Sequence, residues 1–203
     1  QASQHRFLGS GIEGLLRIAS SYSHRFDEVL LSLPKGRKLQ AITVSANRRQ
    51  TTIINATLEN ATLNTNGYLL RIEGSRIKNS KFTTPHIINI FDTELTDSQL
   101  KTEGGQIYAE NIQVHGKVEL DSHNDLTLFL SKTEFDRINL DLSSQHGGIY
   151  RKAQREHPRQ KENGLANPYK TDKADIKDML IIKANQDIYL PKEEEYSAPP
   201  SNH

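Results

Sequence analysis

The chain has 203 residues, of which 34% are hydrophobic, and a formal net charge of +1 at pH 7. So small a charge gives no strong field for nucleic acid or an anionic membrane, and we expect no nucleic-acid partner. The sequence contains no cysteine, which excludes disulfides, thiolate catalysis and zinc–thiolate sites. No apolar run approaches the roughly 18 residues of a membrane-spanning helix, although an anchor or leader before Gln1 stays an open alternative.

Residues 1–28 are expected to form an N-terminal cap that contains a short amphipathic helix over 11–23. The apolar residues of that segment fall on one helical face and are Ile12, Leu15, Leu16 and Ile18. A membrane-surface or partner helix is the alternative interpretation, but the polar side lacks a basic face. An alternating segment from Phe26 to Leu33 then predicts a first strand.

A repeat of 18 to 20 residues occupies the centre of the chain. Six aligned segments end at Val44, Leu63, Phe82, Leu100, Leu120 and Leu140, which lie 19, 19, 18, 20 and 20 residues apart. Apolar residues recur two apart, which indicates extended chain, and the period is too short for helical repeats. No single turn buries its own apolar side chains, so stacking must build the core.

The sequence therefore predicts an all-β fold: a right-handed parallel β-helix (β-solenoid) of about six coils over residues 29–143. A short N-terminal capping helix would precede it, and a largely irregular C-terminal tail would follow. The inward columns are expected to be formed by Leu58, Leu63, Ile72, Ile77, Phe82, Ile90, Leu95, Leu100, Leu120, Leu130, Phe135 and Leu140.

Each coil contains two consecutive five-residue units with a small residue two positions before a large apolar one. Examples are Ala56-Thr57-Leu58-Glu59-Asn60, Ser75-Arg76-Ile77-Lys78-Asn79 and Thr93-Glu94-Leu95-Thr96-Asp97. Over 56–102, and loosely over 133–142, this resembles the pentapeptide-repeat family, which implies a right-handed quadrilateral β-helix. Some members of that family mimic DNA and bind type II topoisomerases, and others are domains of secreted bacterial effectors. Only two units per coil fit here, so a general β-helix with pentapeptide-like faces is the better description.

The outward positions predict neighbours on adjacent coils. Glu59 would lie beside Lys78, and Arg76 beside Glu94, as pairs of opposite charge. His115 occupies an inward column, which predicts a core or corner histidine. A hydroxyl column is either a stack that stabilises turns or an outward ladder, and consists of Thr65, Thr84, Thr102 and Ser122.

Residues 144–203 are expected to form an extended tail, rich in proline and charge, with a short helix near 172–183. Its one apolar island predicts docking either on the chain's own body or on a partner. The residues proposed for that contact are Ile176, Met179, Leu180, Ile181 and Tyr189.

No nucleotide-binding, zinc-protease or serine-hydrolase motif is present, and the outward acidic residues do not cluster. We expect no catalytic residue, metal or cofactor. The predicted function is a non-enzymatic structural or protein–protein interaction and assembly module, with itself or another protein as partner. A carbohydrate-active or carbohydrate-binding β-helix, and a topoisomerase-binding DNA mimic or secreted effector, are the alternatives. An extracytoplasmic or secreted bacterial setting is an expectation from where such folds are common.

Overall fold

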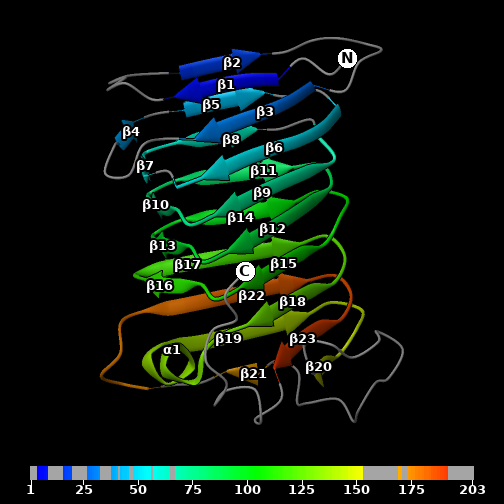
Figure 1. The fold of residues 1–203 in the computed structure, drawn as a ribbon. Coiled ribbons are helices and arrows are strands. Elements are labelled where there is room, and N and C mark those ends of the chain that lie inside the picture. The colour runs from blue at the N-terminus through cyan, green and yellow to red at the C-terminus, as the bar shows by residue number, and fades with distance from the viewer. Residues whose placement is uncertain are drawn as a thin grey trace.

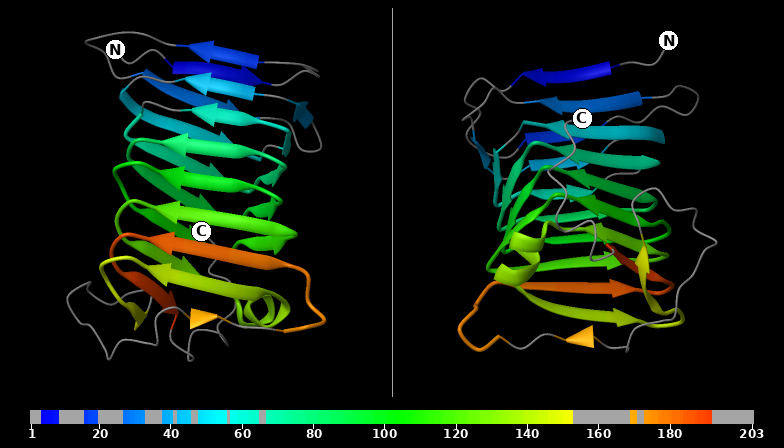
Figure 2. Two further views of the ribbon diagram at one scale, coloured as in Figure 1. Left: turned by 180° about the vertical axis from the view of Figure 1, so that it is seen from behind. Right: turned by 60° about the horizontal axis from the view of Figure 1, so that its bottom comes forward.

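The structure is a computed structural model that describes residues 4–8, 16–19, 27–32, 38–40, 42–45, 48–55, 57–64, 67–152, 169–170 and 173–191. Within these residues the chain winds in the right-handed sense into a stack of parallel strands (Figure 1). The views from behind and from below show the same stack (Figure 2). The predicted all-β solenoid is therefore confirmed. Handedness agrees with the strong preference of parallel crossover connections.

Three sheets form the walls of the solenoid, and the strands of each come from successive rungs. The nine-stranded sheet has the order β1 (Gln4–Leu8), β3 (Asp27–Ser32), β6 (Arg48–Ile54), β9 (Leu69–Glu73), β12 (Ile87–Phe91), β15 (Ile107–Glu110), β18 (Leu126–Phe129), β23 (Ile188–Pro191), β20 (Ile149–Lys152). The five-stranded sheet has the order β16 (Gln113–His115), β13 (Glu94–Thr96), β10 (Arg76–Lys78), β7 (Thr57–Glu59), β4 (Lys38–Gln40). The seven-stranded sheet has the order β21 (Tyr169–Lys170), β19 (Asn139–Ser144), β22 (Met179–Ala184), β17 (Lys117–Ser122), β14 (Gln99–Thr102), β11 (Lys81–Thr84), β8 (Thr62–Asn64). A further pair consists of β2 (Leu16–Ala19) and β5 (Ile42–Ser45).

The core is made of inward side chains that stack on their equivalents in the next rung. In the nine-stranded sheet Ile53, Ile72 and Ile90 occupy one column, and each is at most 1% exposed. Burying one such side chain stabilises the fold by about 1.5–3 kcal/mol. Of the twelve predicted core residues all are buried except Phe135, which is half-buried and packs against the core.

The corners on both sides of the five-stranded sheet depend on a left-handed backbone conformation. Positive φ angles of 46–64° occur in one column at Asn55, Gly74, Asp92 and Asn111, and in another at Asn60, Asn79, Asp97 and Gly116. Glycine, asparagine and aspartate tolerate this conformation best. After five of these eight residues the next residue is small and buried: Ala61, Ser75, Ser80, Thr93 and Ser98. The Ser80 hydroxyl accepts from the Ala61 N–H at 3.0 Å. This explains the small-residue columns of the repeat.

The predicted N-terminal helix is wrong at residues 16–19. Leu16–Ala19 form strand β2, in which Leu16 pairs with Ile42 and Ile18 with Val44; the rest of the predicted helix lies outside the described residues. Two apolar residues spaced by two fit a strand as well as a helix, and the neighbouring strand supplies hydrogen-bond partners. Residues 1–28 also contain β1 and the start of β3, so the solenoid begins before residue 29. Its largest sheet has nine strands, whereas six coils were predicted.

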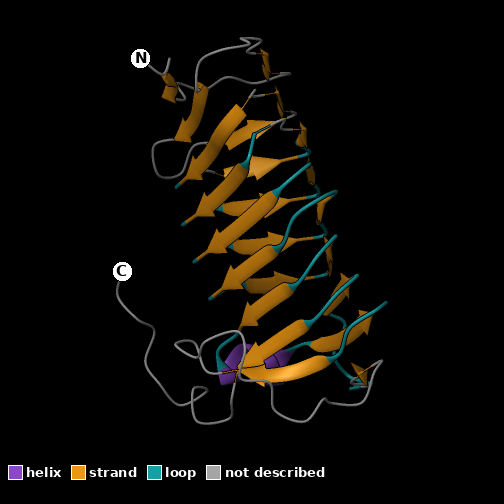
Figure 3. Cartoon of the chain, turned by 90° about the vertical axis from the view of Figure 1, so that its right-hand side faces the viewer, coloured by secondary structure: helices purple, strands orange, loops and turns teal. Residues whose placement is uncertain are grey.

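The predicted irregular C-terminal tail with a helix near 172–183 is also wrong. Met179–Ala184 form strand β22, not part of a helix near 172–183, and β20, β22 and β23 all belong to the solenoid. A six-residue helix α1 (Lys132–Arg137) instead lies where the repeat predicted a coil (Figure 3). Its N-cap is Ser131, whose hydroxyl accepts from the Glu134 N–H at 3.1 Å. A boundary at residue 143 therefore does not separate a body from a tail.

Candidate functional site

The outer face of the nine-stranded sheet carries apolar and aromatic side chains. Leu69 on β9 lies opposite Ile87 on β12, and Glu73 lies opposite Phe91. All four are partly exposed. Tyr68, the residue before β9, is 61% exposed, and its ring stacks on His86 at 4.7 Å. Such a surface offers area that a partner can remove from water.

Aromatic rings continue this face along the rungs. The ring of Phe91 lies 5.7 Å from that of Tyr108, which lies 6.0 Å from that of Phe129. The guanidinium of Arg71 lies 4.8 Å from the centre of the Phe91 ring and forms a 3.1 Å ion pair with Glu73. Tilted ring pairs stabilise by about 0.5–1.5 kcal/mol beyond their buried area. These contacts hold the rings in a fixed arrangement, so a partner would meet an ordered surface.

We call the exposed part of this face the β9–β12 patch. It consists of Tyr68, Leu69, Arg71, His86, Ile87 and Phe91. Sequence reasoning missed it because the aromatic residues are few and lie in different repeats. The signal was present: Phe91 and Tyr108 sit at outward positions of strands that register brings side by side.

Apart from Met179 and Ile181 on β22, the outer faces of the other two sheets are polar and charged. Glu94 lies 3.6 Å from Arg76 and 3.5 Å from His115, and Glu119 lies 3.2 Å from Lys183. The predicted pairing of Arg76 with Glu94 is confirmed by contact. Lys78 and Glu59 are also in register, as predicted.

The core interpretation of His115 is wrong, because His115 faces outward; it ends β16 next to the corner residue Gly116, which fits the corner interpretation. Val114 takes the inward column beside Leu95. One residue more than in the previous coil separates Val114 from the next inward residue, Val118. The left-handed Gly116 lies in this longer corner.

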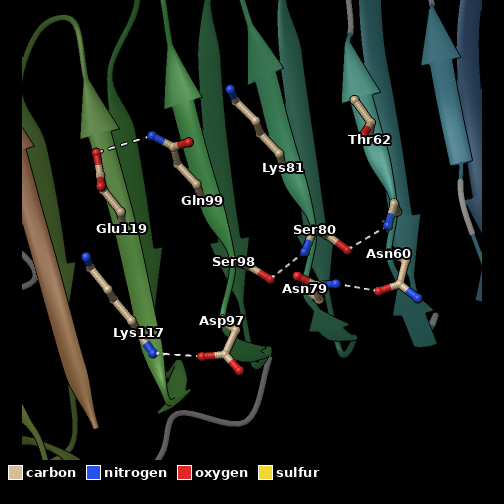
Figure 4. A pocket seen from close by; sticks show the side chains of 11 residues that line it. Asn60, Thr62, Asn79, Ser80, Lys81, Asp97, Ser98, Gln99, Lys117 and Glu119 are labelled. Atoms are coloured by element: carbon tan, nitrogen blue, oxygen red, sulfur yellow. Dashed lines mark hydrogen bonds between the residues drawn. The ribbon is translucent and has the colours of Figure 1, made fainter. Parts of the chain in front are cut away.

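A shallow groove of about 480 Å³ follows the corner between the five- and seven-stranded sheets (Figure 4). Asn79 donates to Asn60 at 2.5 Å, and the Lys117 N–H donates to Asp97 at 3.0 Å. These polar groups are thus engaged with one another along the rungs. The arrangement serves the corner itself, and its walls continue into the outward Gln99 and Glu119.

The column of threonine and serine residues faces the interior of the solenoid. Thr84, Thr102 and Ser122 are at most 1% exposed. The Thr102 hydroxyl donates to the Gly105 carbonyl at 2.7 Å and accepts from the His123 N–H at 3.0 Å. An outward ladder is therefore wrong. Thr102 and Ser122 stabilise turns, as the alternative predicted, whereas the buried Thr84 hydroxyl has no hydrogen-bond partner among the described residues. Thr65 lies outside the described residues.

The residues proposed for a partner-binding tail are part of the solenoid. Leu180 is buried in the core, and Tyr189 is 7% exposed, with its ring 5.9 Å from Tyr150. Ile181 and Met179 face outward from the seven-stranded sheet and are half-buried. Ile176, which precedes the strand, is also half-buried. The apolar island therefore docks on the chain's own body.

Within the described ranges, no three histidine, aspartate or glutamate side chains are grouped as a metal site. Of the outward acids, Asp136 pairs with Lys132 at 2.7 Å, as Glu94 and Glu119 pair with the cations named above. No helix of the described residues is long and apolar enough to cross a membrane.

The geometry defines a β-solenoid with a partly apolar outer face. A family model described as Toastrack DUF4097 matches residues 14–190. The chain therefore belongs to the Toastrack family, and the pentapeptide-repeat family gave no match. The likeness to pentapeptide repeats thus concerns the solenoid form alone. Searches of curated proteins and of solved structures gave no match. The matched range includes β22 and all of β23 except its last residue, Pro191, which makes these strands part of the family's domain.

Proposed function

We propose that this solenoid is a non-enzymatic protein-interaction module that presents the β9–β12 patch to a protein partner. The observation that supports the proposal is the contrast between faces: aliphatic and aromatic side chains gather at the β9–β12 patch, whereas the outward positions of the other two sheets are polar or charged apart from Met179 and Ile181 on β22. Interface centres are enriched in tyrosine, phenylalanine and arginine and depleted of lysine and glutamate.

The chemistry of the patch also describes the partner. The centre is apolar, at Leu69, Ile87 and Phe91, and Arg71 is already paired with Glu73. A complementary surface would therefore be apolar at its centre, with a rim that hydrogen-bonds Tyr68 and His86. Hydrogen bonds between rungs make the face rigid, which lowers the entropy lost on binding.

Site-specific photo-crosslinking tests this proposal in the native host or its lysate. A photoreactive residue at position 68 should give discrete protein adducts, and the same residue at exposed Lys81, on the seven-stranded sheet, serves as the control. The variant Phe91→Ser should weaken the adducts from position 68 about tenfold or more, the loss typical of an interface anchor. The same adducts from both positions, or none from position 68, would contradict the proposal.

Carbohydrate binding is the second candidate, and the exposed Tyr68 ring stacked on His86 favours it, since flat aromatic faces stack on sugars. Its test is direct: polysaccharides should retard the wild-type chain, and not Tyr68→Ser, in affinity electrophoresis. Hydrolysis of those polysaccharides by the chain would overturn the non-enzymatic part of our proposal.

A further inference from the structure

One rung of the solenoid is out of sequence. Strand β22 lies between β17 and β19, and strand β23 lies between β18 and β20. The chain thus passes from the rung of β17 and β18 to that of β19 and β20 and leaves a space one rung high. Residues 179–191 return later and fill it, as the position of β22 and β23 in Figure 1 shows. We call this space the slot.

Helix α1 accounts for the height of the slot. The five-stranded sheet ends at β16, and α1 follows where its next strands would lie (Figure 1). A helix with side chains is about 10–12 Å wide, whereas one rung is about 4.8 Å high. Passing through α1 therefore lowers the chain by about two rungs. The slot is therefore a consequence of residues 132–137.

The slot is specific for an extended segment with alternating apolar residues. Leu180 and Ile182 point inward and are fully buried between the columns of the flanking rungs, and Ile188 does the same on the other wall. Both edges of β22 are paired in parallel, with β17 on one side and β19 on the other. Every inward position and both backbone edges of the insert are thus used.

A second group of contacts holds the start of the insert. The Lys173 ammonium donates to three carbonyls at the end of α1, those of Phe135, Asp136 and Ile138, at 3.0–3.2 Å. The side chain of buried Asn139 accepts from the Lys173 N–H at 2.7 Å. Residues 173–178 of any copy of this chain would form the same contacts if they occupied this position.

We propose that the slot and the β19 edge beside it accept residues 169–191 of a second copy of this chain, β21 included, so that two solenoids exchange their inserted rungs. The contacts in the exchanged form are the same as in the closed form, so only the tether decides between them. The tether, residues 153–168, can span up to roughly 50 Å when extended. That exceeds the roughly 40 Å height of the nine stacked strands, so its length does not confine the insert to its own slot.

The concentration dependence follows from the tether. A tether of this length gives the chain's own insert an effective concentration on the order of millimolar. Exchange should therefore be minor when chains refold at micromolar concentration and should increase steeply toward millimolar. This distinguishes it from association through the outer faces, which needs no unfolding.

Engineered cysteines test the proposal, because the full chain has none of its own. Ser143 on β19 and Lys183 on β22 are register partners, and both are exposed. Adjacent strands place them about 4.8 Å apart, which a disulfide can bridge. Equimolar full-length Ser143→Cys and Lys183→Cys chains are unfolded, mixed, refolded at increasing concentration and oxidised. We expect a disulfide-linked heterodimer whose yield increases several-fold with concentration.

The matched control replaces Ser143→Cys by Thr83→Cys. Thr83 lies in the same outward column of the seven-stranded sheet but three rungs from β22. Heterodimer equal to this control at every concentration would overturn the proposal. The single chain that carries both Ser143→Cys and Lys183→Cys should close an internal disulfide at low concentration. Failure to do so would also overturn the proposal, because β22 would not lie in the slot.

Discussion

Arg137 and Asp178 lie 41 positions apart in the chain, and the guanidinium of Arg137 donates to the carboxylate of Asp178 at 2.5 Å. The same guanidinium donates to Glu134 at 2.6 Å and to the carbonyl of Val114. Glu134 in turn accepts from the Val114 N–H at 2.7 Å, and Asp178 accepts from the Gly116 N–H at 2.7 Å. Val114 is on β16, the last strand of its sheet. Charged side chains therefore take the place of the missing next strand and satisfy its exposed edge.

Acid should weaken this arrangement through Asp178. Burial raises the pKa of Asp178, but hydrogen bonds from Gly116 and Arg137 and the Arg137 charge outweigh burial and leave the pKa below its usual value. A carboxyl group with a lowered folded pKa stabilises the fold above its unfolded pKa of about 4, and this stability is lost as pH falls through the folded pKa. The fold should be weaker at about pH 3 than at about pH 7.

Urea unfolding of the wild type and Asp178→Asn at both pH values measures this effect. The variant should unfold with a free energy lower by about 1 kcal/mol at neutral pH. The difference should shrink at about pH 3, because the unfolded carboxyl is protonated there and the stability that Asp178 contributes is lost as the pH falls through its lowered folded pKa. A difference of the same size at both pH values would show that the charge of Asp178 is not what stabilises the edge.

Glu134 is the buried member of the cluster, and its removal should cost more. Glu134→Ala leaves the Val114 N–H and the Arg137 guanidinium without their shared acceptor, and we expect a loss of about 2–3 kcal/mol in the free energy of unfolding. Glu134→Gln keeps an oxygen for the Val114 N–H and should lose less. Thermal unfolding of both variants beside Lys132→Ala, an exposed residue of the same helix, measures the order. Equal losses for Ala and Gln would contradict the assigned hydrogen bond.

How far the sequence predicts this fold depends on whether a segment repeats. The central rungs share one register, so the columns of Leu58, Ile77 and Leu95 could be predicted from spacing alone. The asparagine, aspartate and glycine columns at the corners were equally visible, and they require only that left-handed backbone be recognised. The β9–β12 patch was harder, because it depends on which outward residues the register brings together.

The slot could not be predicted from the spacing, because the repeat places Leu120 on β17 and Leu140 on β19 in successive coils, and the insert between them lies outside the repeat. Residues 179–182 are four apolar residues in a row, and such a run fits a buried strand and a helix equally well. The flanking rungs decide between strand and helix for residues 179–182, because they offer hydrogen bonds to an extended segment on both sides. Only the three-dimensional arrangement, with α1 as a spacer, contains that information.

Alanine substitutions in β22 separate the strand from the helix that the sequence predicted. A strand places Leu180 and Ile182 inward and Ile181 outward, whereas a helix would place Ile176, Met179 and Leu180 on one face. Leu180→Ala and Ile182→Ala should each cost about 2–5 kcal/mol, as for other buried aliphatic residues. Ile181→Ala should cost under about 1 kcal/mol. Chemical unfolding checks the alternation, and a larger loss at Met179 than at Ile182 would contradict the strand.

The corner glycine Gly116 should not tolerate a side chain. Its φ angle is +64°, and a Cβ atom there would lie 2.0 Å from the Asp97 carboxylate oxygen. Left-handed backbone costs a non-glycine residue roughly 1–2 kcal/mol, and displacing Asp97 removes its bond to the Lys117 N–H. Gly116→Ala should therefore lower the free energy of unfolding by at least that amount. When Asp97 is replaced by glycine, the clash is absent, so the loss of unfolding free energy caused by Gly116→Ala should fall toward the contribution of the left-handed backbone alone. An unchanged loss would exclude the clash as its cause.

Removing the inserted rung should affect the whole C-terminal end of the solenoid. A chain that ends at Lys152 leaves the slot empty, so the inward side chains of β17 and β19 lose a buried layer and both strands lose a hydrogen-bonded neighbour. We expect a lower unfolding midpoint, binding of a hydrophobic dye and concentration-dependent aggregation, as for exposed strand edges. A chain that ends at Pro191 keeps the insert and should unfold like the full chain. Hydrogen exchange locates the effect: amides of β19 and β20 should lose protection in the shorter chain, while those of β9 and β12 keep theirs. Equal protection of β19 in both chains would mean that the slot closes without its insert.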